Sequence, residues 1–227
     1  PNIIVKRMDY DTTRKRDAYK NLIYDFQQKK IDVLVGTQMI AKGLDFDNVS
    51  LVGILDADNI LNFPDFRSHE FAFQLLTQVS GRSGRKEKQG EVILQTYNTE
   101  QELIKYVRNY DYLNFFKNQI SERELFNYPP FSRIISITLK HRNDSQLNFF
   151  SDEFVFYLKK SFGNRVLGPE YPAISKIRNY YLKNILLKIE IGKSLEKAKQ
   201  IIQFVEENLR NQKRLNGCLI IIDVDPL

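Results

Sequence analysis

Apolar residues in the first hundred positions fall mainly into short, uninterrupted runs. Val33-Leu34-Val35 is the clearest of these runs, and Leu51 to Leu55 is another. Runs of branched aliphatic residues without polar alternation are typical of strands that are covered on both faces. We therefore expect strands at 3–8, 32–36, 51–55 and 91–97.

Between these runs lie segments whose apolar residues have helical spacing. One helix is expected to bury a face made of four apolar residues, Tyr19, Leu22, Ile23 and Phe26. Asp11-Thr12-Thr13 offers an N-cap for this helix, and the positive charges of Lys29-Lys30 suit its C-terminus. A second helix is expected over 71–80. Strands that alternate with helices in this way predict a parallel sheet with right-handed crossovers.

The pattern changes after residue 100. Helices are expected over 100–108 and 110–123, and they lead into Asn127-Tyr128-Pro129-Pro130. This is a stiff break, because proline fixes φ and lacks a backbone N–H. We take it as the boundary between two domains, at 1–124 and 125–227, which the chain length of 227 residues accommodates.

Beyond the break, alternation of period two returns. Ile135, Ile137 and Leu139 alternate with polar residues, and the stretch 184–191 repeats the pattern, as expected of half-buried strands. The remaining elements are short strands at 165–168 and 218–224 and helices over 150–158 and 195–209. The order β-α-β-β-α-β is the split βαβ, ferredoxin-like arrangement. The expected fold is therefore an α/β lobe followed by a smaller α+β domain.

Composition narrows the function classes only slightly. The formal net charge of +6 favours an anionic partner, although many basic proteins bind no nucleic acid. Cys218 is the only cysteine, so the chain forms no internal disulfide, and its apolar neighbours indicate a buried thiol and a cytosolic origin. His69 and His141 lack partners at metal-ligand spacing, which predicts no metal site. No apolar run has the length of a membrane span, no signal-peptide pattern is present, and the first residue, Pro1, suggests a piece of a longer protein.

The segment from Val35 to Phe46 leaves a predicted strand and contains Thr37, Lys42 and Gly43. Ligands of open α/β sheets bind at the carboxyl ends of the strands. A hydroxyl, exposed backbone amides and a glycine that permits close approach are the groups that a phosphate backbone needs. The alternative interpretation is a capped helix start without a ligand.

The segment from Gln78 to Arg85 contains two arginines, Arg82 and Arg85, with glycines around them. Arginines at this spacing can point at one polyanion, and their forked donors suit phosphate and stay charged at any relevant pH. The alternative is a solvated basic turn. The occurrence of both segments, in this order and within one α/β unit, favours the ligand interpretation.

These segments resemble known motifs. Thr37 to Asp45 is similar to motif V, and Gln78 to Arg85 to motif VI, of superfamily 2 helicases. With further segments, the resemblance narrows to the PriA family (primosomal protein N′) over essentially the whole chain. The further segments are Arg7-Met8-Asp9-Tyr10-Asp11-Thr12, Leu55-Asp56-Ala57-Asp58, Pro64-Asp65-Phe66-Arg67-Ser68, Gln74-Leu75-Leu76-Thr77-Gln78-Val79, Tyr128-Pro129-Pro130-Phe131 and Asp223-Val224-Asp225-Pro226. Ser80 and Ser83 stand where alanines are usual, which leaves the expected roles intact.

The resemblance implies the C-terminal half of a replication-restart DNA helicase. It implies a second RecA-like lobe with trailing helices, and then a small α+β domain like that of a ribosomal protein. Arg82 and Arg85 would reach the ATP γ-phosphate as catalytic residues. The residues expected near ATP are Gly43, Asp45 and Gln78. Those expected on the tracked DNA strand are Thr37, Gln38, Lys42, Arg7 and Thr12.

Some residues keep two interpretations. Asp56 and Asp58 are either a site or a polar strand end, and we favour the strand end. Arg67 either touches DNA or pairs with Asp65.

The sequence lacks a Gly-x-x-x-x-Gly-Lys-Ser/Thr phosphate loop, and it lacks an Asp-Glu pair in the context expected for holding Mg²⁺. ATP and Mg²⁺ would therefore be shared with a first lobe, and the chain alone is expected to be inactive. The resemblance places zinc only elsewhere in a full-length protein. The main alternative is a non-catalytic DNA- or protein-binding module built on a degenerate lobe, and a different superfamily 2 remodeller is a third reading.

The resemblance also implies the partners. These are branched and single-stranded DNA, single-stranded-DNA-binding protein and other primosome proteins, in the bacterial cytoplasm at the nucleoid and without a membrane. In the second domain, the segment Lys176 to Lys183 interleaves cations with tyrosines, which favours nucleic acid. We expect DNA contacts from Lys176, Arg178, Tyr180 and Lys183, on a hairpin-like extension. The alternative is a solvated edge whose tyrosines turn inward. Lys193 and Lys197 are candidates for the acidic tail of single-stranded-DNA-binding protein.

Overall fold

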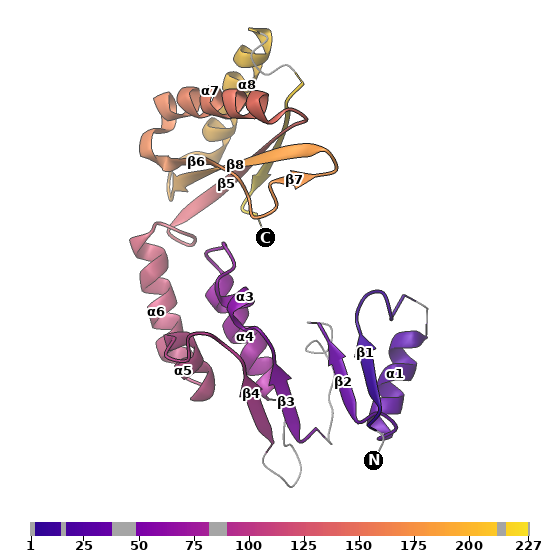
Figure 1. The fold of residues 1–227 in the computed structure, drawn as a ribbon. Coiled ribbons are helices and arrows are strands. Elements are labelled where there is room, and N and C mark those ends of the chain that lie inside the picture. The colour runs from indigo at the N-terminus through magenta and orange to yellow at the C-terminus, as the bar shows by residue number, and fades with distance from the viewer. Residues whose placement is uncertain (1–2, 15–16, 38–48, 82–89, 213–216, 227) are drawn as a thin grey trace. The chain divides into compact units, whose positions relative to one another are not determined.

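The computed structural model describes residues 3–14, 17–37, 49–81, 90–212 and 217–226 (Figure 1). The chain divides into two compact units, residues 1–116 and 117–227. The division falls inside a helix, whereas the sequence pattern placed the domain boundary after residue 124. Each unit is described by itself.

The first unit opens with a βαβ segment. Strands β1 (Val5–Met8) and β2 (Val33–Gly36) pair in parallel, and helix α1 (Ala18–Gln27) connects them. Met8 is fully buried, and the apolar face predicted for the helix packs around it. The two predicted strands and the helix are therefore confirmed.

The predicted start of α1 is wrong. The helix begins at Ala18 after Asp17, and Asp11 to Thr13 do not cap it. Thr12 and Thr13 bond back to Asp9 instead, and Thr13 Oγ1 donates to the carbonyl oxygen of Asp9 over 2.6 Å. Short hydroxyl side chains compete in this way with helix capping, because they can close a local turn.

A second parallel pair joins β3 (Leu51–Ile54) to β4 (Glu91–Leu94). Four helices accompany it: α3 (Asp58–Leu61), α4 (Ser68–Ser80), α5 (Glu102–Arg108) and α6 (Tyr112–Leu125). Their apolar residues form one cluster, in which the rings of Phe73 and Phe115 stack at 4.3 Å. The sequence pattern did not predict α3, which has only four residues.

The expectation that these strands are covered on both faces is wrong for the described part of the chain. Val33 and Val35 are 42% and 47% exposed, because α1 covers β1 and β2 from one side around Met8. The described residues of this unit form two separate parallel pairs and not one continuous sheet.

The second unit is an antiparallel sheet under two helices. Its strands are β5 (Ser132–His141), β6 (Val166–Glu170), β7 (Lys176–Ile177), β8 (Tyr180–Glu190) and β9 (Leu219–Val224). The helices are α7 (Asp144–Phe162), a 3₁₀ turn at Gly163–Arg165 and α8 (Leu195–Asn211). The sheet order β6-β8-β5-β9, with β7 paired to β8, is that of the predicted split βαβ fold.

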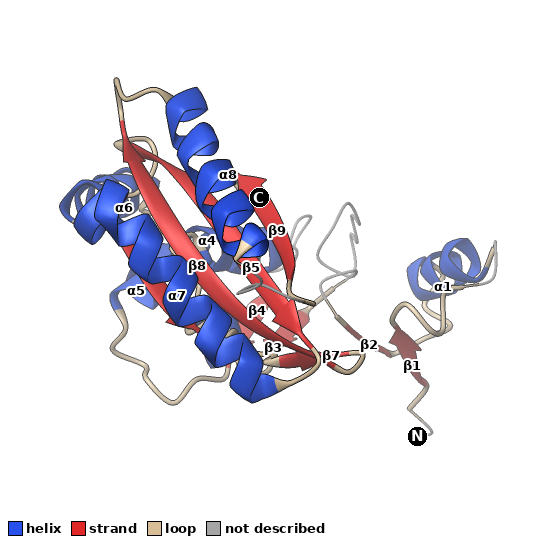
Figure 2. Cartoon of the chain, turned by 90° about the horizontal axis from the view of Figure 1, so that it is seen from above, coloured by secondary structure: helices blue, strands red, loops and turns tan. Residues whose placement is uncertain are grey.

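Helices α7 and α8 lie over one face of this sheet (Figure 2). The inward residues are those that the alternation predicted: Ile135 and Ile137 on β5 oppose Leu187 and Ile185 on β8, and Leu139 is buried in the same cluster. Cys218 is also buried here, and burial raises the pKa of its thiol to about 11. The thiol therefore stays protonated and behaves as a core residue.

The predicted proline break lies within the second unit and packs against β8. Lys188 on β8 donates to the carbonyl oxygen of Phe126 over 2.6 Å, and its ammonium lies 3.6 Å from the ring centre of Tyr128. Burial lowers the pKa of Lys188. At the same end of the sheet, Asp225 pairs with Arg133, which fastens the segment after β9 to β5.

Candidate nucleotide and nucleic-acid sites

Two predicted DNA-contacting segments emerge at one edge of the β1–β2 pair. The register pairs Arg7 with Val35 and Met8 with Gly36, so both strands reach their carboxyl ends together. Asp9 follows β1, and Thr37 follows β2 with an exposed side chain. The carboxyl edge of a parallel pair is where α/β proteins bind ligands. The fold thus brings Thr37 to the same edge as the loop that follows Arg7.

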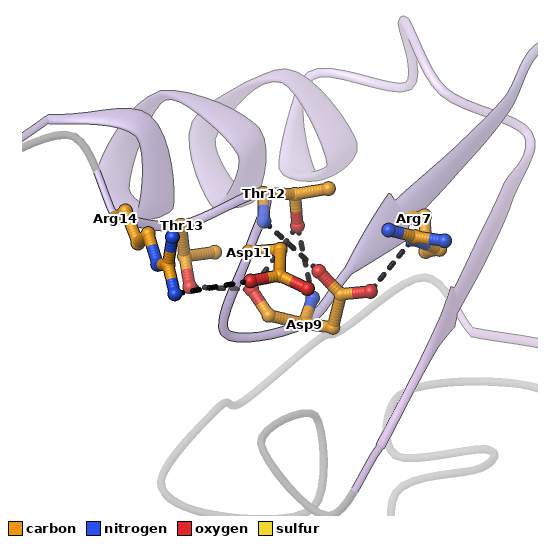
Figure 3. A network of polar contacts seen from close by, with 6 residues as sticks. All are labelled: Arg7, Asp9, Asp11, Thr12, Thr13 and Arg14. Atoms are coloured by element: carbon orange, nitrogen blue, oxygen red, sulfur yellow. Dashed lines mark hydrogen bonds and ion pairs between the residues drawn. The ribbon is translucent and has the colours of Figure 1, made fainter.

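Asp9 organises that loop (Figure 3). Its carboxylate accepts the backbone N–H of Thr12 over 2.9 Å and lies 2.6 Å from Arg7 Nε. The hydroxyl of Thr12 accepts the backbone N–H of Asp9 over 2.9 Å, which closes the turn. The bond from Thr12 is the main reason that the pKa of Asp9 is lowered. Thr12 therefore shapes the loop, while the exposed Arg7 side chain faces solvent.

The same loop carries an aromatic residue that the sequence patterns did not single out. Tyr10 is 71% exposed, and the Arg14 guanidinium lies 5.1 Å from the centre of its ring. Arg14 also pairs with Asp11 over 3.5 Å. The one sequence feature that could have pointed to Tyr10 is its place in the segment Arg7 to Thr12, which resembles the PriA family.

Most of the predicted nucleotide site lies outside the described residues, namely Gly43, Asp45, Arg82 and Arg85. The predicted DNA contacts Gln38 and Lys42 also lie outside them. Gln78 is described, and its exposed side chain lies in the last turn of α4. In the sequence, Arg82 follows Gly81, the C-cap residue of that helix. In the sequence, the end of helix α4 therefore directly precedes Arg82.

The two ambiguous carboxylates have structural partners. Asp58 accepts the hydroxyl of Thr96 over 3.0 Å and the backbone N–H of Tyr97 over 2.9 Å, which ties α3 to the segment after β4. Asp56 accepts the side-chain amide of Asn59. These contacts agree with the favoured interpretation of a polar strand end.

Arg67 pairs with Asp65. Arg67 Nε and Nη2 each donate to one carboxylate oxygen over 2.9 Å, and this pairing is the main reason that the pKa of Arg67 is raised. The guanidinium also lies 5.1 Å from the ring centre of Phe66 and 5.6 Å from that of Phe71. Of its two interpretations, the ion pair is the one that the structure contains.

A second candidate surface lies on the β7–β8 hairpin. Arg178 and Asn179 form its two-residue turn, both with left-handed φ, of 47° and 66°. Two-residue hairpins favour this backbone, because it follows the twist of the strands. The expected hairpin-like extension is confirmed, and its tip exposes Lys176 and Arg178.

Cations lie against the tyrosines of this hairpin. Lys176 Nζ is 4.4 Å from the ring centre of Tyr181, and the Arg142 guanidinium is 5.4 Å from that of Tyr180. Arg142 comes from the end of β5, where His141 pairs with Tyr181. The sequence patterns missed Arg142, because only the strand register brings it here. Both tyrosines are half-buried and Tyr181 packs on the core, so the inward alternative holds in part.

Lys183 has a different environment from its neighbours. It is only 8% exposed, and its ammonium lies 4.9 Å from the ring centre of Tyr171. The hydroxyl of Tyr171 donates to Asp144 over 2.8 Å, which is the main reason that its pKa is raised. Lys183 therefore offers little surface to DNA.

By contrast, Lys193 and Lys197 are exposed: Lys193 just before the start of α8, and Lys197 in its first turn.

The described residues contain neither a membrane-spanning helix nor a metal-binding cluster. None of the described helices has the length and apolarity needed to cross a membrane. Within the same part of the chain, no cluster of three or more histidine, cysteine or acidic side chains is arranged to hold a metal ion.

Comparison with known families gives two matches. The family model of the primosomal protein N C-terminal domain matches residues 124–227. The family model of the helicase conserved C-terminal domain matches residues 2–87. The two matches follow one another along the chain in the order expected from the motifs.

Curated relatives match the whole chain. The replication restart protein PriA of Bacillus subtilis (strain 168) is 38% identical over 228 residues, and that of Synechocystis is 36% identical over 233. The protein of the same name from Borreliella burgdorferi is 34% identical over 229 residues. Each alignment covers 100% of this chain but only 28%, 27% and 34% of the respective relatives.

Proposed function

Because the chain belongs to the PriA family, of whose members it spans the C-terminal part, we propose that it forms half of an ATP-driven DNA motor. The longer protein would unwind DNA from 3′ to 5′ at stalled or branched forks and restart replication by assembling a primosome. It would act in the bacterial cytoplasm, at the nucleoid. ATP and Mg²⁺ would be shared with a first lobe, and any zinc would lie elsewhere in the longer protein.

In this proposal, the first unit contributes both ATP and DNA contacts. Arg82 and Arg85 stabilise charge on the transferred γ-phosphate, where forked donors act without reorganising. Gln78, Gly43 and Asp45 lie near the nucleotide. Backbone phosphates of the tracked strand meet the remaining candidates, Thr37, Gln38, Lys42 and Arg7, and Thr12 supports Arg7 by closing the turn at Asp9.

The observation that supports this proposal best is the common edge of β1 and β2. Arg7 and Thr37 come from distant parts of the sequence, yet the register ends their strands together. A solvated basic turn or a simple helix cap needs no such convergence. Two phosphate-contacting groups on one strand do need it.

The second unit would add a DNA contact through the β7–β8 hairpin. Lys176 and Arg178 neutralise phosphates there, and the half-buried Tyr180 supports Arg142 at the rim. Lys183 instead holds Tyr171 in place. The acidic tail of single-stranded-DNA-binding protein would meet Lys193 and Lys197.

Unwinding of a labelled forked oligonucleotide by the full-length protein tests the proposal. Wild type should separate the strands only with ATP, and Arg82→Ala should bind the fork but fail to unwind it. Arg108→Ala, an exposed arginine on α5 outside both sites, serves as the matched control and should unwind normally. Fork binding without ATP hydrolysis by wild type would favour the degenerate binding module instead.

The chain by itself should hydrolyse no ATP, because its sequence contains no phosphate loop. Phosphate release in the presence of DNA measures this. Turnover that persists through purification and disappears in Arg85→Ala would contradict the half-site.

A further inference from the structure

A preorganised aromatic ring stands at the edge proposed to contact DNA. Tyr10 follows β1 directly after Asp9, at the carboxyl edge that also bears Thr37. A single exposed ring is ordinary on a protein surface. The inference therefore rests on the position of Tyr10 and on how its loop is held.

The loop is held firmly by its own polar groups (Figure 3). Asp9 and Thr12 exchange two backbone-to-side-chain hydrogen bonds of 2.9 Å, and Thr13 adds a third contact to Asp9. The Arg14 guanidinium lies over the Tyr10 ring, and Tyr10 remains 71% exposed. A ring restrained before binding loses little conformational entropy when a ligand stacks on it.

The charges around the ring favour stacking over phosphate attraction. The cation that lies over the ring, Arg14, already pairs with Asp11, so a phosphate at the ring would have to compete with that carboxylate. Although Arg14 lies over the ring, Tyr10 stays largely exposed, and every nucleobase offers a π face to stack on it.

We propose that Tyr10 stacks on an unpaired base of the DNA strand that crosses this edge, with Arg14 positioning the ring. This inference rests on the proposed function, since it requires single-stranded DNA at the carboxyl edge of β1 and β2. It adds a base contact to a site whose other candidates contact phosphates. The contact carries no sequence preference, because stacking uses the face of the base and not its edge.

The chain contains a matched control for this residue. Tyr24 is 57% exposed, the Lys30 ammonium lies 5.5 Å from its ring centre, and Lys30 pairs with Asp25 over 3.0 Å. The two tyrosines thus share the same chemistry, an exposed ring beside an ion-paired cation. Tyr24 belongs to the later half of α1, which leads to the start of β2. It therefore lies toward the amino ends of the two strands, whereas Tyr10 follows the carboxyl end of β1.

Binding of the full-length protein to two oligonucleotides tests the proposal. One is single-stranded oligothymidine, and the other has the same length and backbone but abasic sites in place of the bases. Fluorescence anisotropy across a salt series gives the Kd and the salt slope for each. Tyr10→Ala should weaken oligothymidine binding about tenfold, within the range for loss of one base–aromatic stack. It should leave abasic binding and the salt slope unchanged.

Other variants separate stacking from folding and from apolar bulk. Tyr10→Phe keeps the ring and should bind like wild type, whereas Tyr10→Leu should behave like the alanine variant. Tyr24→Ala should alter neither oligonucleotide. Equal losses on both oligonucleotides, or no loss on either, would overturn the stacking role. A wild-type protein that binds neither oligonucleotide would instead refute the proposed function, on which the stacking role depends.

Discussion

The two units bury their apolar residues in different ways. In the second unit, a single cluster joins α7 and α8 to the sheet, and residues such as Ile137, Leu187 and Phe154 have no exposed surface. In the first unit, the described residues form two smaller clusters, and the one at β1, α1 and β2 contains a single fully buried side chain, Met8.

Because of this difference, the larger core lies in one unit and most of the candidate ligand contacts lie in the other. The second unit has the larger core and carries candidate ligand contacts only at its rim. The first unit contains nearly all the residues assigned to ATP and DNA, while strand residues such as Val33 stay exposed. Binding and switching elements commonly come from the less stable parts of a protein. We therefore expect substitutions in the two units to affect different measurements.

The largest expected effect is catalytic and belongs to the first unit. In the full-length protein, Arg85→Ala should lower kcat by on the order of 10³-fold, the scale of arginine-finger loss. The affinity for ATP should change little, because the contact strengthens in the transition state. Lysine at this position should not restore turnover, since it lacks the forked geometry. Steady-state ATP hydrolysis with saturating DNA measures both constants.

Arg108→Ala again provides the control and should keep wild-type kcat. Near-normal turnover in Arg85→Ala would assign the segment a structural role. A rise in KM alone, with kcat preserved, would reassign Arg85 to ground-state binding of ATP.

The largest expected loss of stability belongs to the second unit. Phe154→Ala should lower the free energy of unfolding by about 3–5 kcal/mol, because the fully enclosed ring leaves a cavity that its neighbours cannot fill. Met8→Ala should cost about 2 kcal/mol, at the low end for such truncations, since its neighbours are only partly buried and can close in. Urea unfolding of the chain, followed by circular dichroism, compares the two variants.

A greater loss from Met8→Ala than from Phe154→Ala would contradict the contrast between the units. Phe156→Ala, which removes an exposed ring from the same helix as Phe154, should change the midpoint little and is the control.

A smaller effect concerns the ion pair between Asp225 and Arg133. Arg133 is the main cause that lowers the pKa of Asp225, so the charged carboxylate stabilises the fold at neutral pH. That contribution is lost as the pH falls through the lowered value, below about pH 4. Both side chains are partly exposed, 41% for Asp225 and 47% for Arg133, so solvent screening limits the effect of Asp225→Asn to about 1 kcal/mol.

Unfolding midpoints at pH 7 and pH 3 test this prediction. Wild type and Asp225→Asn should differ at pH 7, and the difference should narrow toward pH 3 as the carboxylate becomes protonated. A difference that persists unchanged at pH 3 would show that Asp225 acts through shape and not through charge.

Hydrophobic periodicity predicted the strands and helices whose own apolar residues repeat at a regular spacing. The alternation at Ile135 to Leu139 and at 184–191 predicted paired strands, and the split βαβ order followed. The start of α1 was not predictable in this way, because Thr12 can either cap a helix or close a turn on Asp9. Helix α3 was missed since four residues are too few to show a period.

The sequence predicted a candidate site only where the residues of that site are close together along the chain. Lys176 and Arg178 lie together on the hairpin, as their spacing implied. Arg142 beside Tyr180 depends on the register of β5 with β8, and the burial of Lys183 depends on Tyr171 from another strand connection. Contacts between distant segments need the fold, and no local pattern contains them.

The smallest expected effect is on DNA binding by the second unit. Fluorescence anisotropy of the full-length protein on a branched oligonucleotide across a salt series gives both the affinity and the salt slope. Lys176→Ala and Arg178→Ala should each weaken binding a few-fold and reduce the slope by about one unit, the value for one lost phosphate contact. Lys183→Ala should leave the slope unchanged, because its ammonium is buried over Tyr171 and meets no phosphate. Lys183 is thus an internal control of the same charge. A slope that falls equally in all three variants would reflect the net charge of the unit, and a slope that falls in none would remove the hairpin from the DNA interface.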